Sequence, residues 1–330
     1  MFFEDEVVSY NKALKGVDII GVPSDLGASI VGSNEGPFAI RNCGLFSSLK
    51  YLAKDVADRG NIAVSLREEI YAEMERHHPQ IFVHGDRMFS THSPGFEVVK
   101  TYLDKMFAAL AREVVACLQS QRLPLILGGD HSLSMGSLRG VYEVIQQRSQ
   151  RLGVMWFDAH LDGHDSQSSI SGNLHGMPLG ALLYGDPLLG IKPLCDPQDV
   201  VIIGARSVDR GERERMEDLG VHIYGLDALS SSGGLDAVIA TLKKDFFTKV
   251  DAVHVSFDLD VCDPQLAPGV STPELAGLFE RDIYRLMRMV ALSEKLISFE
   301  MVELNPRFDK DRQTAKWACE VILWALGSGV

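Results

Sequence analysis

The sequence predicts an α/β fold: a doubly wound, mostly parallel sheet of about eight strands with helices on both faces. Strand-like and helix-like stretches alternate along all 330 residues without a stretch typical of a linker. Several strand-like stretches are near-continuous apolar runs rich in β-branched residues, as buried parallel strands tend to be. Four of these runs end in side chains suited to metal binding, where open α/β sheets bind ligands. We therefore expect a single domain over residues 1–330.

The apolar runs set the bounds of the predicted strands. They lie at residues 17–22, 61–65, 123–127, 153–157, 200–203, 222–224, 252–257 and 296–302. Helical spacing of apolar residues predicts helices between the strands, the first of them opening at Gly36-Pro37. These helices cover residues 36–50, 96–119, 133–148, 210–219, 235–246, 273–290 and 314–326.

Two segments do not follow this alternation. Residues 66–94 mix charge, prolines and histidines, which predicts a loop or irregular excursion. The histidines show no recognisable ligand spacing, which favours solvated loop side chains over a metal site. They are His77, His78, His84 and His92. Residues 163–176 follow the strongest ligand cluster, and we expect this second segment to shape a substrate pocket.

Composition excludes several classes of protein. With 46% hydrophobic residues and a mean hydropathy of +0.04, the chain can bury a large core. The sequence lacks a long uncharged apolar run and its start is acidic, so we expect a cytoplasmic location and no membrane partner. A net charge of −13 argues against nucleic acid as a partner and would mildly attract cationic small molecules, while solubility explains most of this charge. The five cysteines include no CxxC pair, which argues against disulfides and thiolate zinc sites.

Six ligands suited to a pair of divalent cations stand at the ends of apolar runs. The four runs lead into Asp130-His131, into Asp158-Ala159-His160-Leu161-Asp162, into Asp258-Leu259-Asp260 and into Glu303. On an extended backbone, alternate side chains share a face, so the ligands within each cluster are expected to converge. Buried carboxylates at such close range repel one another unless a counter-charge is present. The pattern therefore predicts bound cations.

Other site classes find less support. No GxGxxG follows the first strand, and no GxxxxGK[ST] exists, which argues against dinucleotide and nucleoside triphosphate sites. Ser132 beside His131 suggests a nucleophile, but no GxSxG turn encloses it. His160 and His164 have the spacing of a helical zinc site, although Gly163 and the strand-end context speak against it.

Three ordered motifs resemble the signatures of the ureohydrolase family, which includes arginases, agmatinases and guanidino-acid hydrolases. They are Gly128-Gly129-Asp130-His131-Ser132, Asp158-Ala159-His160-Leu161-Asp162 and Ser256-Phe257-Asp258-Leu259-Asp260-Val261-Cys262-Asp263-Pro264. The similarity extends from about Asp18 to the C-terminal helix and leaves out the first sixteen residues and residues 66–94. Three motifs in order are far more specific than one.

This resemblance implies two Mn²⁺ per chain and an arginase-like fold. The implied metal ligands are His131, Asp158, His160, Asp162, Asp258 and Asp260. Zinc, iron, cobalt and nickel remain open on ligand type alone. A hydroxide bridging the two ions is expected to attack the guanidinium carbon, after which the intermediate collapses to urea and an amine. The family also implies a homotrimer, sometimes a hexamer.

The resemblance assigns three catalytic residues. Asp162 would pass a proton from the hydroxide to the leaving nitrogen, and His175 would exchange protons with solvent. Glu303 would pair with the substrate guanidinium, because a carboxylate accepts a fork of N–H donors.

The stretch from Ser171 to Pro178, SGNLHGMP, resembles the arginase version of the substrate loop. In that version the residues matching Ser171 and Asn173 bind an α-carboxylate. Asp209 and Glu212 match positions that receive the α-amino group. Together these four residues favour L-arginine, hydrolysed to L-ornithine and urea.

Some positions depart from the arginase pattern. His164 stands where an asparagine is usual, and Ser207 where an aspartate is usual. His164 and Thr272 are still expected to contact substrate. The stretches GVPSDLG and STPE lean towards agmatinase-like relatives. Hydrolysis of agmatine or a guanidino acid, or a catalytically silent arginase-like binding protein, therefore remain alternatives.

Overall fold

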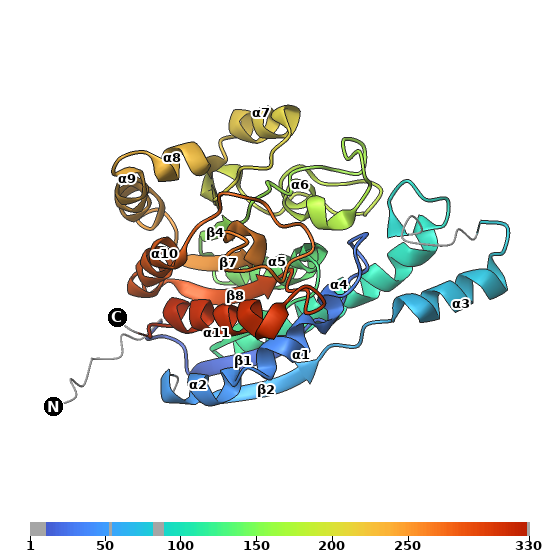
Figure 1. Ribbon diagram of the computed structural model, residues 1–330, viewed down its shortest axis with the longest axis horizontal. Coiled ribbons are helices and arrows are strands. Elements are labelled where there is room, and N and C mark those ends of the chain that lie inside the picture. Colours follow the sequence, from blue (N-terminus) through green and yellow to red (C-terminus); the bar gives the residue numbers. More distant parts are fainter. Residues whose placement is uncertain (1–10, 53–54, 82–88, 329–330) are drawn as a thin grey trace.

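The computed structural model describes residues 11–52, 55–81 and 89–328, which together form one eight-stranded sheet (Figure 1). Every pairing between neighbouring strands is parallel, which confirms the predicted fold class. The strand order is β2-β1-β3-β8-β7-β4-β5-β6. The strands are β1 (Gly16–Gly21), β2 (Val56–Asn61), β3 (Arg122–Leu127), β4 (Leu152–Phe157), β5 (Val200–Ile203), β6 (His222–Tyr224), β7 (Ala252–Asp258) and β8 (Leu296–Val302).

Helices cover both faces of the sheet (Figure 1). One face packs against α1 (Gly36–Arg41), α2 (Leu45–Leu52), α8 (Leu226–Ser230), α9 (Gly234–Thr241), α10 (Glu280–Leu292) and α11 (Gln313–Ala325). The other face packs against α3 (Arg67–His77), α4 (Phe96–Gln119), α5 (Ser134–Gln147), α6 (Pro178–Tyr184) and α7 (Arg210–Leu219). None of the described helices is long and apolar enough to cross a membrane.

Alternation along the strands divides the core into two layers. In β1, Val17 and Ile19 belong to one buried cluster, while Ile20 belongs to the other. In β3, Leu125 and Ile126 are divided in the same way. Because successive side chains of a strand point to opposite faces, an apolar run without polar interruptions serves both layers at once.

The four strands that end in the predicted ligand clusters are neighbours at the centre of the sheet. In the order β3-β8-β7-β4, the runs that precede His131, Glu303, Asp258 and Asp158 lie side by side. All four strands point the same way, so their carboxyl ends meet at one edge. That edge is where open α/β sheets bind ligands.

Two predictions near the β2 edge are wrong. The strand predicted at residues 61–65 lies at Val56–Asn61, and its residues are mostly exposed. An edge strand of this kind contains no apolar run by which to recognise it. Residues 66–94, predicted as a loop, contain the helix α3. Only Ile70 and Met74 form its buried apolar positions, too sparse a pattern to indicate a helix.

Smaller differences concern helix bounds. The helix predicted at 273–290 begins at Glu280, because residues 273–279 run irregularly past the carboxyl end of the sheet. The helix predicted at 36–50 is divided into α1 and α2. The short helices α6 and α8 were not predicted, since one or two turns carry little periodicity. His84 lies outside the described residues.

Candidate metal centre and substrate cavity

The loop after β3 places His131 at the carboxyl edge of the sheet. Gly129 passes so close to the neighbouring backbone that a Cβ there would lie 1.7 Å from the Ser24 carbonyl oxygen. The next residue, Asp130, donates its backbone N–H to the same oxygen at 2.9 Å. A side chain at position 129 would therefore displace the loop, and with it the short helix His131–Leu133.

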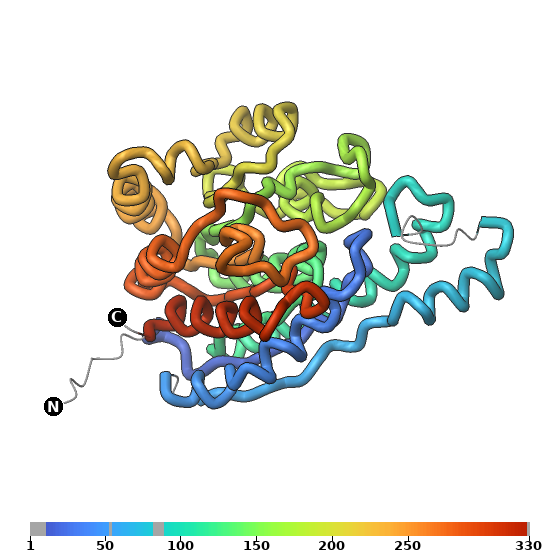
Figure 2. Tube along the Cα trace, in the orientation of Figure 1, coloured from blue at the N-terminus to red at the C-terminus, as the bar shows by residue number. Residues whose placement is uncertain are grey.

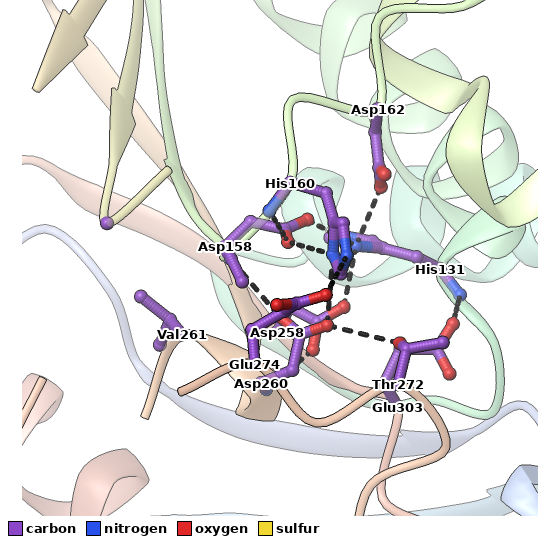
Figure 3. A network of polar contacts seen from close by, with 12 residues as sticks. His131, Asp158, His160, Asp162, Asp258, Asp260, Val261, Thr272, Glu274 and Glu303 are labelled. Carbon is purple, nitrogen blue, oxygen red and sulfur yellow. Dashed lines mark hydrogen bonds and ion pairs between the residues drawn. The ribbon is translucent and has the colours of Figure 1, made fainter. Parts of the chain in front are cut away.

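His131 is buried and faces three carboxylates (Figure 3). Its Nδ1 lies 3.2 Å from Asp158 Oδ2, 3.0 Å from Asp162 Oδ2 and 3.1 Å from Asp258 Oδ2. On the far side of the ring, Nε2 lies 2.7 Å from the Ser256 hydroxyl oxygen. The contact with Ser256 orients the ring so that Nδ1 faces the carboxylates.

His160 forms a second cluster that shares Asp158 with the first (Figure 3). Its Nδ1 lies 3.3 Å from Asp158 Oδ1 and 3.1 Å from Asp260 Oδ2. The opposite nitrogen, Nε2, lies 3.8 Å from Glu274 Oε1. Two sets of three ligand atoms, joined through one aspartate, suit a pair of neighbouring cations.

Tight turns, and not extended backbone, bring these ligands together. β4 ends at Phe157, and the next turn is closed by a hydrogen bond from the His160 N–H to Asp158 Oδ1 at 2.7 Å. The Asp260 N–H likewise donates to Asp258 Oδ1 at 2.8 Å. The expectation of face-sharing along extended strands was therefore wrong in its mechanism, although the predicted ligands do converge. In such turns an aspartate fixes the backbone with one oxygen. The second oxygen of Asp158 accepts the Trp156 Nε1–H at 3.0 Å, and that of Asp258 faces His131.

The cluster concentrates negative charge among side chains that are mostly buried. Burial, with repulsion from Asp158, raises the pKa of Asp162 to about 7. Burial and the neighbouring Asp260 raise the pKa of Asp258 well above its ordinary value. Burial lowers the pKa of His131, but hydrogen bonds to three aspartates outweigh burial and raise it. A bound cation would relieve this repulsion, so the residues fit a metal centre.

Glu303 follows β8 in a left-handed conformation, with φ of 65°. This conformation costs a non-glycine residue backbone energy. Its Oε1 accepts the His131 N–H at 2.8 Å and lies 3.2 Å from His175 Nδ1. Its Oε2 is buried and has no hydrogen-bond partner among the described residues. That oxygen remains available to an N–H donor of a ligand.

His175 and Glu303 support each other's charged forms. Burial lowers the pKa of His175, yet the hydrogen bond and charge of Glu303 raise it to about 9. Burial raises the pKa of Glu303, but the His175 hydrogen bond and charge hold it below its ordinary value. The two side chains therefore form an ion pair beside the metal ligands.

A cavity of about 400 Å³ opens above the clusters and contains most of the predicted site. Its lining includes five of the six predicted metal ligands, all but Asp158, together with His175 and Glu303. Four predicted substrate contacts line it as well, namely His164, Asp209, Glu212 and Thr272. The Thr272 hydroxyl lies 3.4 Å from Asp260 Oδ2, so it links the cavity wall to the metal centre (Figure 3).

His164, Asp209 and Glu212 form one side of this cavity. His164 Nε2 lies 3.1 Å from Asp209 Oδ2 and 3.9 Å from Glu212 Oε2. The Gly163 N–H donates to Glu212 Oε1 at 2.7 Å. Burial raises the pKa of Glu212. The His164 side chain therefore lies beside Asp209 and Glu212, the two carboxylates that the family resemblance assigns to the α-amino group of the substrate.

Ser171 and Asn173 are not among the residues lining the cavity. The Ser171 hydroxyl accepts the Asn173 N–H at 3.2 Å, and Asn173 Nδ2 donates to the Ser29 hydroxyl at 3.2 Å. The structure thus shows both side chains engaged within their loop and with a neighbouring loop.

Sequence reasoning gave no role to several residues at the site. Ser207 and Val208 line the cavity, and the Ser207 N–H donates to the Ala159 carbonyl at 3.0 Å. The Trp156 ring stacks on His131 with centroids 4.1 Å apart. Trp156 precedes Asp158 by two residues, as Ser256 precedes Asp258. The same alternation that located the aspartates therefore offered a signal for both.

Comparison with known proteins shows which family the chain resembles. The sequence model of the arginase family matches residues 15–327. The arginase of Bacillus caldovelox is 39% identical over 313 residues, which cover 92% of this chain and 96% of that one. The chain belongs to the arginase family. Members of this family are metal-dependent amidinohydrolases, and the predicted hydrolase class is thereby confirmed.

Solved structures of arginases share the fold. The Bacillus caldovelox enzyme superposes with a TM-score of 0.80 at 36% identity, covering 96% of this chain and 99% of that one. An arginase from Entamoeba histolytica in complex with L-ornithine superposes with a TM-score of 0.81 at 27% identity, covering 95% and 98%. The arginase fold expected from the sequence is confirmed by these neighbours.

Proposed function

We propose that the chain hydrolyses L-arginine to L-ornithine and urea at a centre holding two Mn²⁺ ions. The observation that carries the proposal is the arrangement of the cavity, with five of the six clustered metal-type ligands at its floor, Asp158 beneath them, and Glu212 and Asp209 at one side. L-Arginine has two cationic groups, its guanidinium and its α-amino group. Carboxylates line both the floor of the cavity, where Glu303 lies, and its side, where Glu212 and Asp209 lie. The L-ornithine complex of the Entamoeba relative supports a ligand of this class.

The ions would be held by His131, Asp158, His160, Asp162, Asp258 and Asp260. Two divalent cations supply a nucleophile at neutral pH by lowering the pKa of water, and they stabilise negative charge that develops during hydrolysis. His131 and His160 would each offer Nδ1, the nitrogen that already faces the carboxylates.

Glu303 would orient the guanidinium. Its buried Oε2 has no partner among the described residues, and it can accept an N–H from the substrate. Its Oε1 is held by the His131 N–H, so the carboxylate is fixed before substrate arrives. Binding then costs little reorganisation.

Two groups would move protons. Asp162 would take a proton from the attacking water and pass it to the leaving nitrogen, so that the tetrahedral intermediate collapses to urea and an amine. His175 lies at the cavity wall and is part-exposed, and it would exchange protons with solvent.

The amino-acid end of the substrate would lie towards the mouth. Glu212 and Asp209 would receive the α-amino group, His164 and Thr272 would contact substrate, and Ser171 and Asn173 would serve the α-carboxylate. Ser171 and Asn173 would do so from the adjoining loop, since they stand outside the cavity lining.

Family resemblance supports three further proposals. The chain would act as one ureohydrolase domain, it would assemble as a homotrimer, and it would work in the cytoplasm.

A urea-release assay on the manganese-loaded chain tests the proposal. Arginine, agmatine and guanidino acids are compared, and metal content is measured by elemental analysis. We expect about two metals per chain, and arginine to give the highest kcat/KM. A higher kcat/KM for agmatine or a guanidino acid would show that this compound, and not arginine, is the substrate. The absence of urea from every compound would indicate a catalytically silent relative.

A further inference from the structure

The chain segment just before α4 is interlocked with the loop at residues 169–176, which we call the substrate loop. The Ser90 hydroxyl donates to the Ser171 carbonyl at 2.9 Å. The Thr91 N–H donates to the Gly172 carbonyl at 2.9 Å. These bonds join segments about eighty residues apart in the sequence, and neither belongs to the metal centre.

Gly172 shows how closely the two segments fit. Its φ is 70°, and a Cβ at this position would lie 2.1 Å from the Ser90 hydroxyl oxygen. On the other side of the contact, His92 Nε2 lies 2.9 Å from the Ser169 carbonyl oxygen. Residues 90–92 therefore determine where the first half of the substrate loop runs.

Arg67, the first residue of α3, holds a second loop. Its side chain is 6% exposed, and its Nε lies 2.9 Å from Asp25 Oδ1. Its Nη2 also donates to the carbonyls of Asp25 and Ala28. The other carboxylate oxygen of Asp25 accepts the Gly32 N–H at 2.9 Å. One guanidinium thus fixes the turn at residues 25–32 through several donors at once.

That turn bears directly on the second half of the substrate loop. The His175 N–H donates to the Gly27 carbonyl at 3.1 Å, and Asn173 Nδ2 donates to the Ser29 hydroxyl at 3.2 Å. The Gly27 N–H in turn donates to Asp130 Oδ2 at 3.0 Å. The turn therefore holds the second half of the substrate loop at Asn173 and at the backbone of His175, whereas the His175 imidazole is held by Glu303.

Phe89 connects residues 90–92 to Arg67 of α3. It is buried, the Arg67 guanidinium lies 4.1 Å from the centre of its ring, and Tyr71 of α3 packs edge-on at 5.5 Å. Figure 2 shows α3, in cyan, running out beyond the sheet before the chain returns through α4. Within the excursion predicted to be an irregular loop, α3 and residues 89–92 thus contact the loops that border the substrate cavity.

We infer that α3 and residues 89–92 position the substrate loop, with Arg67 as the principal positioning residue, and thereby set the affinity for the amino-acid end of the substrate. This inference rests on the proposed function for the identity of that substrate. Arg67 is not among the residues that line the cavity, and it contacts the 25–32 turn and the Phe89 ring. Losing it weakens substrate binding and leaves the metal centre intact.

The test compares Arg67→Met, Arg67→Lys and Ser90→Ala with Arg76→Met, a matched control at an exposed position of the same helix. For arginine we expect KM to rise about tenfold in Arg67→Met and about threefold in Ser90→Ala, with kcat within about twofold. Partial unfolding would lower apparent kcat and leave KM unchanged, so the split between the two constants separates positioning from stability. Arg67→Lys keeps the charge and should restore part of the affinity.

Amide hydrogen exchange gives a second measurement that needs no activity. Peptides covering 169–176 should exchange faster in Arg67→Met and Ser90→Ala, while peptides of β3, β4 and β7 and the metal content stay unchanged. Unchanged exchange at 169–176, or a KM equal to that of Arg76→Met, overturns the inference. If Arg67→Met does not fold, Arg67→Lys and Ser90→Ala decide the question. If the wild-type chain releases no urea, the proposed function fails, and exchange alone still decides the positioning role.

Discussion

The floor and the mouth of the cavity are built in different ways. The floor consists of residues at the ends of β3, β4, β7 and β8, and most of them are buried. The mouth consists of residues beyond the strand ends, such as His164, Asp209 and Glu212 in the first turn of α7. Sheet register places the floor, whereas contacts between loops place the mouth. Under the proposed function, the metal ligands and Glu303 would stand at strand ends, and the contacts that select the substrate would stand in the segments beyond them.

A similar contrast exists within the mouth. The Glu212 side chain is 5% exposed and accepts a backbone hydrogen bond, whereas the Asp209 side chain is 62% exposed. Both carboxylates lie within 4 Å of His164 Nε2. The buried carboxylate interacts in a lower effective dielectric, so it should contribute more to binding a cationic group.

The largest effect is expected at the floor. Asp258→Ala should lower kcat/KM for arginine about a thousandfold or more and reduce metal content, because it removes a ligand and leaves His131 without one of its three carboxylates. Urea release and elemental analysis measure both. Asp251→Ala is the matched control, an exposed aspartate just before the same strand. Full activity in Asp258→Ala would contradict the assigned site.

Glu303→Gln should come next, with a fall in kcat/KM of about a hundredfold, since a neutral amide cannot balance the guanidinium charge. Metal content should remain near the wild-type value, because Glu303 stands beside the ligands and is not one of them. Glu294→Gln, at the other end of β8, is the control. Loss of metal in Glu303→Gln would instead place this residue in the metal centre.

Glu212→Gln tests the buried carboxylate of the mouth. We expect KM for arginine to rise about tenfold with kcat little changed, because a charged hydrogen bond to the amino group is weakened. A guanidino acid that has a carboxylate but no α-amino group should be affected less. Glu214→Gln, exposed on the same helix, is the control. An equal effect on both substrates would show that Glu212 does not recognise the amino-acid end.

Asp209→Asn should have the smallest effect, a rise in KM of about twofold, because solvent screens an exposed carboxylate. Raising the salt concentration should reduce the difference between Asp209→Asn and wild type. A larger effect than that of Glu212→Gln would reverse the order proposed for the two positions.

Much of the floor was predictable because its signals are local. The runs that became β3, β4, β7 and β8 were located within one residue at each end, and each leads directly into its ligands. The alternation of buried side chains along a strand and the spacing of the ligands each span only a few consecutive residues. Both can therefore be recognised in the sequence. The turn geometry was not predicted. It depends on hydrogen bonds from the His160 and Asp260 N–H groups to the preceding aspartates, and these bonds form only where the backbone leaves the extended conformation.

The mouth and its support were less predictable. Residues 66–94 were expected to be irregular, yet α3 supplies Arg67 to a loop about forty residues earlier. No local pattern signals this pairing, since the partner carboxylate of Asp25 lies in a different segment. Ser171 and Asn173 were assigned from a motif, but the structure places their side chains in contacts outside the cavity lining.

The amino-acid sequence alone determined the parallel α/β architecture, the ligand types and the strand ends that carry them, because burial and ligand chemistry are properties of short stretches. Tertiary structure decided which strands are neighbours, which oxygens face each imidazole, and which loops hold the mouth. Those features depend on contacts between residues far apart in the chain, and such contacts exist only once the sheet has assembled.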